Sequence, residues 1–314
     1  KPVKTHHPAR AYKPTQSIIT AKHRAPIKSS MAPTQIALQV STMGYQSTHQ
    51  RIVIARQPSQ SQPAPFAKSL VYARYDRVLT THTPTQKIRY SNIPVVVAPH
   101  AMTLGGGCEI AMHADVTQAA AETYMGLVEM GVGLIPGGGG SKEMALRASA
   151  LFNQGDIQNP LIRELFLNVG MAKVSTSAHE AMELGLLRKG IDAISVNKKR
   201  RIADAKATVI SLSNKGYRAP ANEKNIKVLG KQILGSFLVG ADSMFHAGFI
   251  TEHEKLMSEK LGYVIAGGDL SAPTLVSEQY LLDIEREAFL SLTGEKKTLE
   301  RIEHMLKKGK PLRN

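Results

Sequence analysis

Leu104-Gly105-Gly106-Gly107-Cys108-Glu109 is the stretch that decides the fold, because three glycines and an acid follow a short apolar segment. The β-branched, apolar residues 92–98 predict a buried strand. We expect a turn over residues 99–107 and the first turns of a helix over residues 108–112. Glycine lets the backbone approach a ligand and present its N–H groups. Glycines at a strand-to-helix junction are therefore suited to stabilising negative charge on an oxygen.

A second acid, Glu129, follows in Tyr124-Met125-Gly126-Leu127-Val128-Glu129. It precedes Gly131-Val132-Gly133-Leu134-Ile135-Pro136 and then four consecutive glycines, residues 137–140. Carboxylates are common partners for moving a proton to or from carbon or water. Two acids beside glycine-rich turns indicate an enzyme that holds a polarised oxygen on backbone amides and transfers protons through Glu109 and Glu129.

Together these motifs resemble the crotonase (enoyl-CoA hydratase/isomerase) superfamily over residues 86–186, and within it the hydratase part of bifunctional fatty-acid β-oxidation proteins. The family signature is Leu-Gly-Gly-Gly-Cys-Glu, a second Glu, and Gly-x-x-Pro-Gly-x-Gly-Gly, which here ends at Gly140. Residues 175–186 resemble the helix that follows. The resemblance implies an α/β fold, a crotonase-like β-β-α superhelix with a helical C-terminal region, whose N-terminal strands are missing or replaced.

The resemblance also implies roles for individual residues. The amide of Gly106 would donate to the thioester oxygen of a bound acyl-CoA, with Gly105, Gly107 and Gly137 completing the substrate-binding set. Glu109 would activate the water that adds at Cβ of a trans-2-enoyl-CoA, and Glu129 would exchange the proton at Cα. Members of the superfamily that only shift a double bond often keep just the second acid. Two glutamates therefore favour a hydratase, with an enoyl-CoA isomerase or a non-catalytic binding module as alternatives.

Other chemistries find less support. Ser141 and Lys142 after the four glycines lack the Gly-Lys-Ser/Thr order of a phosphate loop. No Gly-x-Gly-x-x-Gly follows a predicted strand, so we expect neither NAD nor another redox cofactor, and no metal. His100 is expected to be a structural turn residue. Cys108 is the only cysteine, and a small apolar packing role explains it better than nucleophilic chemistry.

The positive charge is concentrated at one end of the sequence. The net charge is +15, but residues 1–87 hold 13 of the 40 Lys and Arg and only one acid, Asp76. They also hold nine of the 16 prolines and a single glycine, Gly44. We therefore expect three parts: a basic, disordered or non-native segment (1–87), a crotonase-like catalytic core (88–215) and a helical C-terminal region (216–314). Residues 52–55 and 70–73 read as short strands within the first part.

Three interpretations of residues 1–87 compete. The segment is basic and poor in acids, as organellar transit segments are, and its interleaved Tyr and Lys/Arg also suit a nucleic-acid-binding arm. We favour a third, a shifted reading frame or a fusion, because family-like sequence begins abruptly at Gln86. A motif for the second oxyanion donor, similar to Phe-Ser-x-Gly-Ala-Asp/Asn, does not occur before that point.

The rest of the sequence predicts helices and contacts. A helix is expected from His179 onward through a basic stretch to Leu212, with residues 198–201 as a solvated face. After a connector at residues 216–225, apolar residues recur at helical spacing over 228–238, 275–290 and 299–306. We expect an acyl-CoA substrate, a homo-oligomer or a dehydrogenase half as partner, no membrane and no nucleic acid. The expected location is cytoplasmic, with a mitochondrion or another organelle as the alternative.

Overall fold

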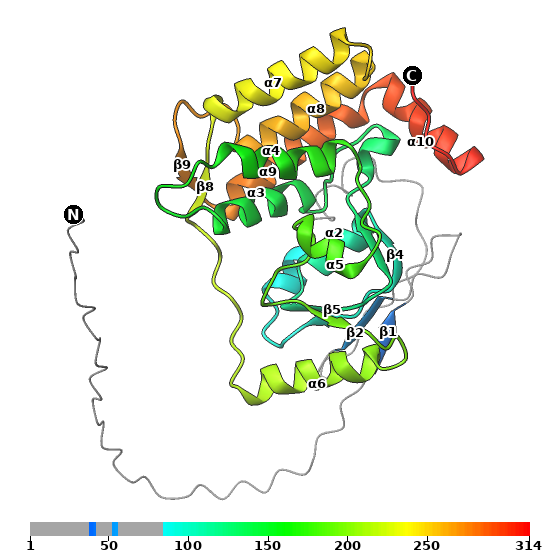
Figure 1. Ribbon diagram of the computed structural model, residues 1–314, viewed down its shortest axis with the longest axis vertical. Helices are drawn as coiled ribbons and strands as arrows, with labels where there is room; N and C mark the ends of the chain where they lie inside the picture. Colours follow the sequence, from blue (N-terminus) through cyan, green and yellow to red (C-terminus); the bar gives the residue numbers. More distant parts are fainter. Residues whose placement is uncertain (1–37, 42–51, 56–83) are drawn as a thin grey trace, which may run out of the picture. The chain divides into compact units, whose positions relative to one another are not determined.

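The computed structural model describes residues 38–41, 52–55 and 84–314 of the 314-residue chain (Figure 1). All of the described residues belong to one compact unit. The predicted strand at residues 70–73 and the three interpretations of residues 1–87 therefore lie largely outside the described residues. The division into parts at residues 87 and 215 stays a prediction.

Among the described residues the largest sheet has the order β1-β2-β3-β5-β7. Its first strands are antiparallel, with Ile54 of β2 opposite Val97 of β3, whereas β3, β5 and β7 are parallel. The predicted strands at 52–55 and within 92–98 are both confirmed. The strand bounds are β1 (Leu38–Ser41), β2 (Ile52–Ala55), β3 (Val96–Val97), β5 (Val116–Ala120) and β7 (Ala193–Ser195).

A second, two-stranded parallel sheet carries the glycine motif. It pairs β4 (Ala101–Leu104) with β6 (Thr123–Gly126) and is followed by helix α2 (Gly106–Met112). The expectation of a turn over residues 99–107 is wrong for β4, because pairing with β6 supplies the backbone hydrogen bonds that a short strand lacks on its own. The helix after the glycines is confirmed and starts two residues earlier than expected.

The helices of this part begin with η1, which precedes the second glycine turn. They are η1 (Glu129–Val132), α3 (Gly140–Ala150), α4 (Asn159–Gly170), α5 (Ala178–Glu183) and α6 (Arg201–Asn214). Ser177 caps α5 by accepting from the Glu180 N–H, in agreement with the predicted helix. The expectation that residues 179–212 are helical is confirmed for α5 and α6 but is wrong between them, where β7 pairs with β5. Residues 198–200 are exposed as expected, but Arg201 is buried against the fold.

The C-terminal region is mainly helical, with one small two-stranded antiparallel sheet. Its elements are β8 (Ile226–Val228), α7 (Lys231–His246), α8 (Glu252–Ala266), β9 (Thr274–Val276), α9 (Glu278–Thr293) and α10 (Lys296–Lys308). Val228 and Leu275, expected in helices, lie instead in β8 and β9, which pair antiparallel. Helix α8 was not predicted, although the Thr251 and Glu254 capping box marks its start. Helix α10 ends at Gly309, as expected.

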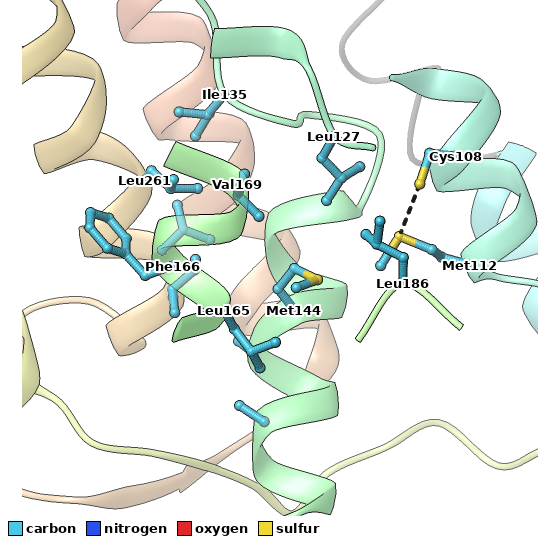
Figure 2. Packing of buried hydrophobic residues seen from close by; sticks show 14 of the residues in the cluster. Cys108, Met112, Leu127, Ile135, Met144, Leu165, Phe166, Val169, Leu186 and Leu261 are labelled. Carbon is cyan, nitrogen blue, oxygen red and sulfur yellow. Dashed lines mark hydrogen bonds between the residues drawn. The ribbon is translucent and has the colours of Figure 1, made fainter. Parts of the chain in front are cut away.

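One hydrophobic cluster joins the part of the fold that carries the glycine turns to the C-terminal helices (Figure 2). It contains residues of α2, α3 and α4 together with residues of α7, α8 and α9. The rings of Phe166 on α4 and Phe237 on α7 stack with centroids 4.3 Å apart. Helices α7 and α8 run side by side, and α6 packs separately against β2, β3 and β5 (Figure 1). In the described part of the chain, no helix has both the length and the apolarity that a membrane crossing requires.

Candidate active site

Parallel pairing of β4 and β6 brings both predicted acids to one edge of the small sheet. Leu104 at the end of β4 lies opposite Gly126 at the end of β6. Because parallel strands point the same way, the segments that leave them start side by side. Glu109 lies one turn into α2 after the first strand, and Glu129 begins η1 after the second.

The turn between β4 and α2 requires glycine. Gly105 has φ +54° and donates its N–H to the Gly126 carbonyl at 2.9 Å, which ties the turn to the neighbouring strand. A side chain at this position would be strained by its backbone conformation. It would also be crowded, because a Cβ built on Gly105 lies 3.1 Å from Glu129 Oε1. The sequence therefore uses glycine both for the turn and for the approach of the second acid.

Gly106 and Gly107 form the accessible part of this turn. Gly106 is exposed and Gly107 is half-buried. As the first residues of α2 they have amides without a partner within the helix, and no hydrogen bond among the described residues uses the Gly106 amide. A Cβ built on Gly106 lies 3.9 Å from Glu109 Oε2. The structure thus brings Glu109, Glu129 and the Gly105–Gly106 turn together.

The second glycine turn holds Glu109 itself. The N–H groups of Gly138 and Gly140 both donate to Glu109 Oε1 at 2.8 Å. A Cβ on Gly138 would lie 2.4 Å from Glu109 Oε2, and one on Gly140 would lie 2.7 Å from Oε1. The turn is therefore glycine-rich because its backbone lies directly against a carboxyl group.

Gly137 has a different neighbour. A Cβ built there would lie 2.2 Å from the ring of Phe289 on α9, and Gly137 itself is buried. The ring therefore uses the space that a side chain would need. A contact of Gly137 with substrate stays a prediction.

Burial and nearby negative charges shift the pKa values of both acids upward. Burial raises the pKa of Glu109 well above its usual value, and the charges of Glu129 and Glu285 raise it further. The amides of Gly140 and Gly138 oppose this rise. Burial likewise raises the pKa of Glu129 to about 7. One oxygen of Glu129, Oε2, is buried without a hydrogen-bond partner among the described residues. The pair thus favours a state with at least one proton near neutral pH.

Glu285 on α9 is a site neighbour that the sequence did not reveal. Its side chain is 0% exposed and accepts the N–H of Gly139 and of Lys142, each at 2.7 Å. It lies 146 positions after Gly139. A glutamate within an amphipathic helix gives no local signal that it reaches a distant glycine turn.

A buried ionic cluster behind the glycine turn was also missed. Burial works to raise the pKa of Glu143, but Arg89, Lys142 and Arg147 together hold it well below its usual value. Arg89 contacts Glu143 directly, and Arg147 Nε lies 3.0 Å from Glu143 Oε1. Lys142, also 0% exposed, donates to Glu278 Oε1 at 2.7 Å. The cluster joins α3 to α9 and to the residues before β3.

The remaining candidates have structural surroundings. Cys108 is buried, burial raises the pKa of its thiol, and its Sγ lies 3.8 Å from Met112 Sδ (Figure 2). This agrees with the predicted packing role. His100 is half-buried directly before β4. Within the described ranges, no three His, Cys, Asp or Glu residues are grouped as metal ligands.

A mostly apolar groove of about 580 Å³ lies next to η1 but is a separate feature. Its walls come from α4, α7, α8 and the C-terminal residues, with Phe166, Phe237 and Met257 among them. Met130 lines it, whereas Glu109 and Glu129 do not. The convergence of the two acids is therefore on the β4–α2 turn and not in this groove.

Comparison with known proteins shows which sequences are similar to the one that carries this site. Residues 74–150 match the family model described as enoyl-CoA hydratase/isomerase. A protein of Bacillus subtilis (strain 168) named "Probable 3-hydroxyacyl-CoA dehydrogenase" is 51% identical over 228 residues, which are 73% of this chain and 28% of that protein. The short-chain-enoyl-CoA hydratase of Clostridium acetobutylicum is 33% identical over 112 residues, 35% of this chain and 38% of that enzyme.

Solved structures are more distant. An enoyl-CoA hydratase from Bacillus halodurans superposes with a TM-score of 0.42 at 16% identity, covering 72% of this chain and 66% of that one. The chain spans 28% of the length of the Bacillus subtilis relative and 38% of the Clostridium one. The glycine-rich motifs, both glutamates and these sequence matches give one conclusion: the chain belongs to the crotonase superfamily and is related to enoyl-CoA hydratases and fatty-acid oxidation enzymes.

Proposed function

We propose that this chain is an enoyl-CoA hydratase of fatty-acid β-oxidation, which adds water reversibly to a trans-2-enoyl-CoA and gives a 3-hydroxyacyl-CoA. The observation that carries the proposal is the convergence of two carboxyl groups on one glycine turn. Glu129 Oε1 and Glu109 Oε2 lie 3.1 Å and 3.9 Å from Cβ positions built on the adjacent Gly105 and Gly106.

The thioester oxygen is the group that needs stabilisation. When water adds at Cβ, negative charge moves through the conjugated system onto this oxygen and forms an enolate. The Gly106 N–H, exposed and unused by the described hydrogen bonds, donates to it. A second donor from elsewhere in the chain is not assigned.

The two acids then divide the proton transfers. Glu109 removes a proton from the attacking water, and Glu129 delivers a proton to Cα of the enolate, so that H and OH are added across the double bond. One group must start as a carboxylate and the other as a carboxylic acid. A close, buried pair with raised pKa values supports such a singly protonated state near neutral pH.

The test uses crotonyl-CoA and a matched pair of variants at Gly106. Gly106→Pro removes the N–H at the first helical position, where proline is accepted. Gly106→Ala keeps the N–H, and its new Cβ meets open space apart from Glu109 Oε2 at 3.9 Å. We expect loss of the conjugated-thioester absorbance with the wild type and with Gly106→Ala, and none with Gly106→Pro. Equal rates for both variants would contradict the assigned donor.

Replacing either acid tests the proton transfers separately. Glu109→Gln and Glu129→Gln should each lower turnover by about 10²-fold or more, with the fold retained. An enoyl-CoA isomerase is the alternative within enzymes: it would shift the double bond of a 3-enoyl-CoA and tolerate Glu109→Gln. A chain that binds crotonyl-CoA without turnover would instead be a binding or assembly module.

The Bacillus subtilis relative, of which this chain covers 28%, supports a proposal about the larger protein to which the chain corresponds. This chain corresponds to the hydratase part of a bifunctional protein whose other part is a 3-hydroxyacyl-CoA dehydrogenase. The chain itself would use an acyl-CoA thioester and no cofactor, in a cytoplasmic setting and as part of a homo-oligomer or beside the dehydrogenase part. Supplying 3-hydroxybutyryl-CoA and NAD⁺ to the purified chain should then form no NADH. NADH formation would place dehydrogenase activity in this chain and contradict the assignment.

A further inference from the structure

Two glutamates from distant helices share the amides of one glycine turn. Gly138 and Gly140 donate to Glu109 on α2, while Gly139 and Lys142 donate to Glu285 on α9. The N–H groups of residues 138, 139, 140 and 142 thus alternate between the two carboxylates. Each donor–acceptor distance is 2.7 or 2.8 Å, within the range of strong charge-assisted hydrogen bonds.

This alternation links the position of one carboxylate to the other. The backbone of residues 138–142 can move away from Glu285 only by breaking the two hydrogen bonds from Gly139 and Lys142. The same movement would shift the Gly138 and Gly140 amides that hold Glu109 Oε1. Gly138 also lies so close to Glu109 that a Cβ there would be 2.4 Å from Oε2. A movement of Glu285 is therefore transmitted through the turn to Glu109.

The charge of this anchor also acts on the two acids of the site. A fully buried carboxylate is costly, and here it adds repulsion to two others. The charge of Glu285 raises the pKa of both Glu109 and Glu129, after burial itself. Two titratable side chains among the described residues, Lys142 and His113, lie next to Gly139. Burial and the Lys142 charge lower the pKa of His113, which keeps this ring neutral. Lys142 is neutralised mainly by Glu278 and Glu143.

We propose that Glu285 is a positioning residue for Glu109, which holds the glycine turn so that Glu109 Oε2 lies beside Gly106 and the reacting water. The proposal rests on the hydratase function proposed above. It adds that an acid on the C-terminal helix α9, outside the glycine motifs, sets the geometry and the protonation of the base. The helical C-terminal region would then be part of the catalytic apparatus and not only of the packing.

The test is Glu285→Gln in the full chain, with kcat, KM and the pH profile as readouts. Glutamine keeps the size of the side chain, but one of the turn amides then faces an NH₂ group in place of an acceptor oxygen. We expect kcat to fall by about 10²-fold, the loss typical of a 1 Å misplacement, while KM for crotonyl-CoA stays within about twofold. Removal of the charge should move the acidic limb of the kcat profile to lower pH.

Two control variants separate positioning from stability. Glu287→Gln changes an exposed acid on the same helix and should leave kcat, the pH profile and thermal stability unchanged. Glu278→Gln removes a buried acid that contacts the Lys142 side chain and not the turn amides. It should lower the melting temperature without moving the acidic limb.

A spectroscopic readout keeps the proposal testable even without turnover. The infrared band of the protonated Glu109 carboxyl is identified by its loss in Glu109→Gln, and its titration is followed in wild type and in Glu285→Gln. The variant should titrate at lower pH. The same titration in both proteins, or an unchanged kcat and pH profile in Glu285→Gln, would overturn the positioning role. An inactive wild type with a shifted Glu109 titration would reject the proposed function but keep the link between the two acids.

Discussion

Replacing Gly138 by alanine tests how closely the glycine turn must approach Glu109. A Cβ at this position would lie 2.4 Å from Glu109 Oε2 and 3.0 Å from Cδ, whereas ordinary contact begins near 3.4 Å. The two groups must therefore separate by about 1 Å. The carboxyl cannot simply rotate away, because Oε1 accepts N–H groups from Gly138 and Gly140.

Two consequences follow for the Gly138→Ala variant. Overpacking of this kind lowers the free energy of unfolding by about 1–3 kcal/mol. A 1 Å displacement of a reacting group lowers turnover by about 10²-fold. We therefore expect kcat for crotonyl-CoA hydration to fall by about two orders of magnitude, with a folded protein at 25 °C. Initial rates and chemical denaturation measure the two effects separately.

The matched control is Gly235→Ala on α7. Gly235 is exposed, and nothing lies within 4 Å of a Cβ built there. Alanine in a helix should raise the stability by about 1 kcal/mol without changing kcat. If Gly138→Ala kept the wild-type kcat, or if its structure showed Glu109 in place, the proposed close hold on the base would be wrong.

Three further changes test the electrostatics and packing of the described fold. The pKa of Glu129 rises from 4.5 to about 7 on folding. The free energy of unfolding is therefore highest below pH 4.5, where Glu129 is protonated in both states, and falls by about 3 kcal/mol as the pH rises through 7 and the buried carboxyl must ionise. Glu129→Gln should flatten that part of the melting-temperature curve between about pH 5 and 8, and an equally steep curve would refute the shift. Glu143→Gln leaves buried cations without their carboxylate and should cost about 3–5 kcal/mol in urea unfolding, whereas the exposed Glu287→Gln should cost almost nothing. Gly267→Ala combines φ +82° with a Cβ 2.4 Å from Val228, so its melting temperature should fall clearly below that of Gly235→Ala, and equal values would contradict the crowding.

Local sequence was sufficient for the parts of the site that depend on neighbours in the chain. The glycines before Glu109 mark a turn that needs a positive φ at Gly105, and the helix that follows fixes Glu109 one turn further on. The buried strand near residue 96 and the end of α10 at Gly309 also follow from short-range patterns. These features are set by backbone conformation and hydrophobic periodicity, which act within a few residues.

Short apolar runs were ambiguous for the same reason. Val228 and Leu275 fit a helical pattern but lie in strands β8 and β9, because Val228 pairs with Thr274 and Leu275 pairs with Lys227, far away in the sequence. The sequence predicted a turn at residues 101–104, but in the structure these residues form β4 and pair with β6. Strand identity here depends on a partner strand that periodicity within one run cannot specify.

The tertiary structure alone decided which groups surround the two acids. The sequence placed Glu109 and Glu129 in the same enzyme, but the amides that hold Glu109 come from the second glycine turn, and those that hold Glu285 join that turn to α9 across 146 positions. A carboxyl group reveals its function in the sequence only when its partners are nearby. Hydrogen bonds and charge repulsion act through space, so the ionisation of the site is a property of the packed helices.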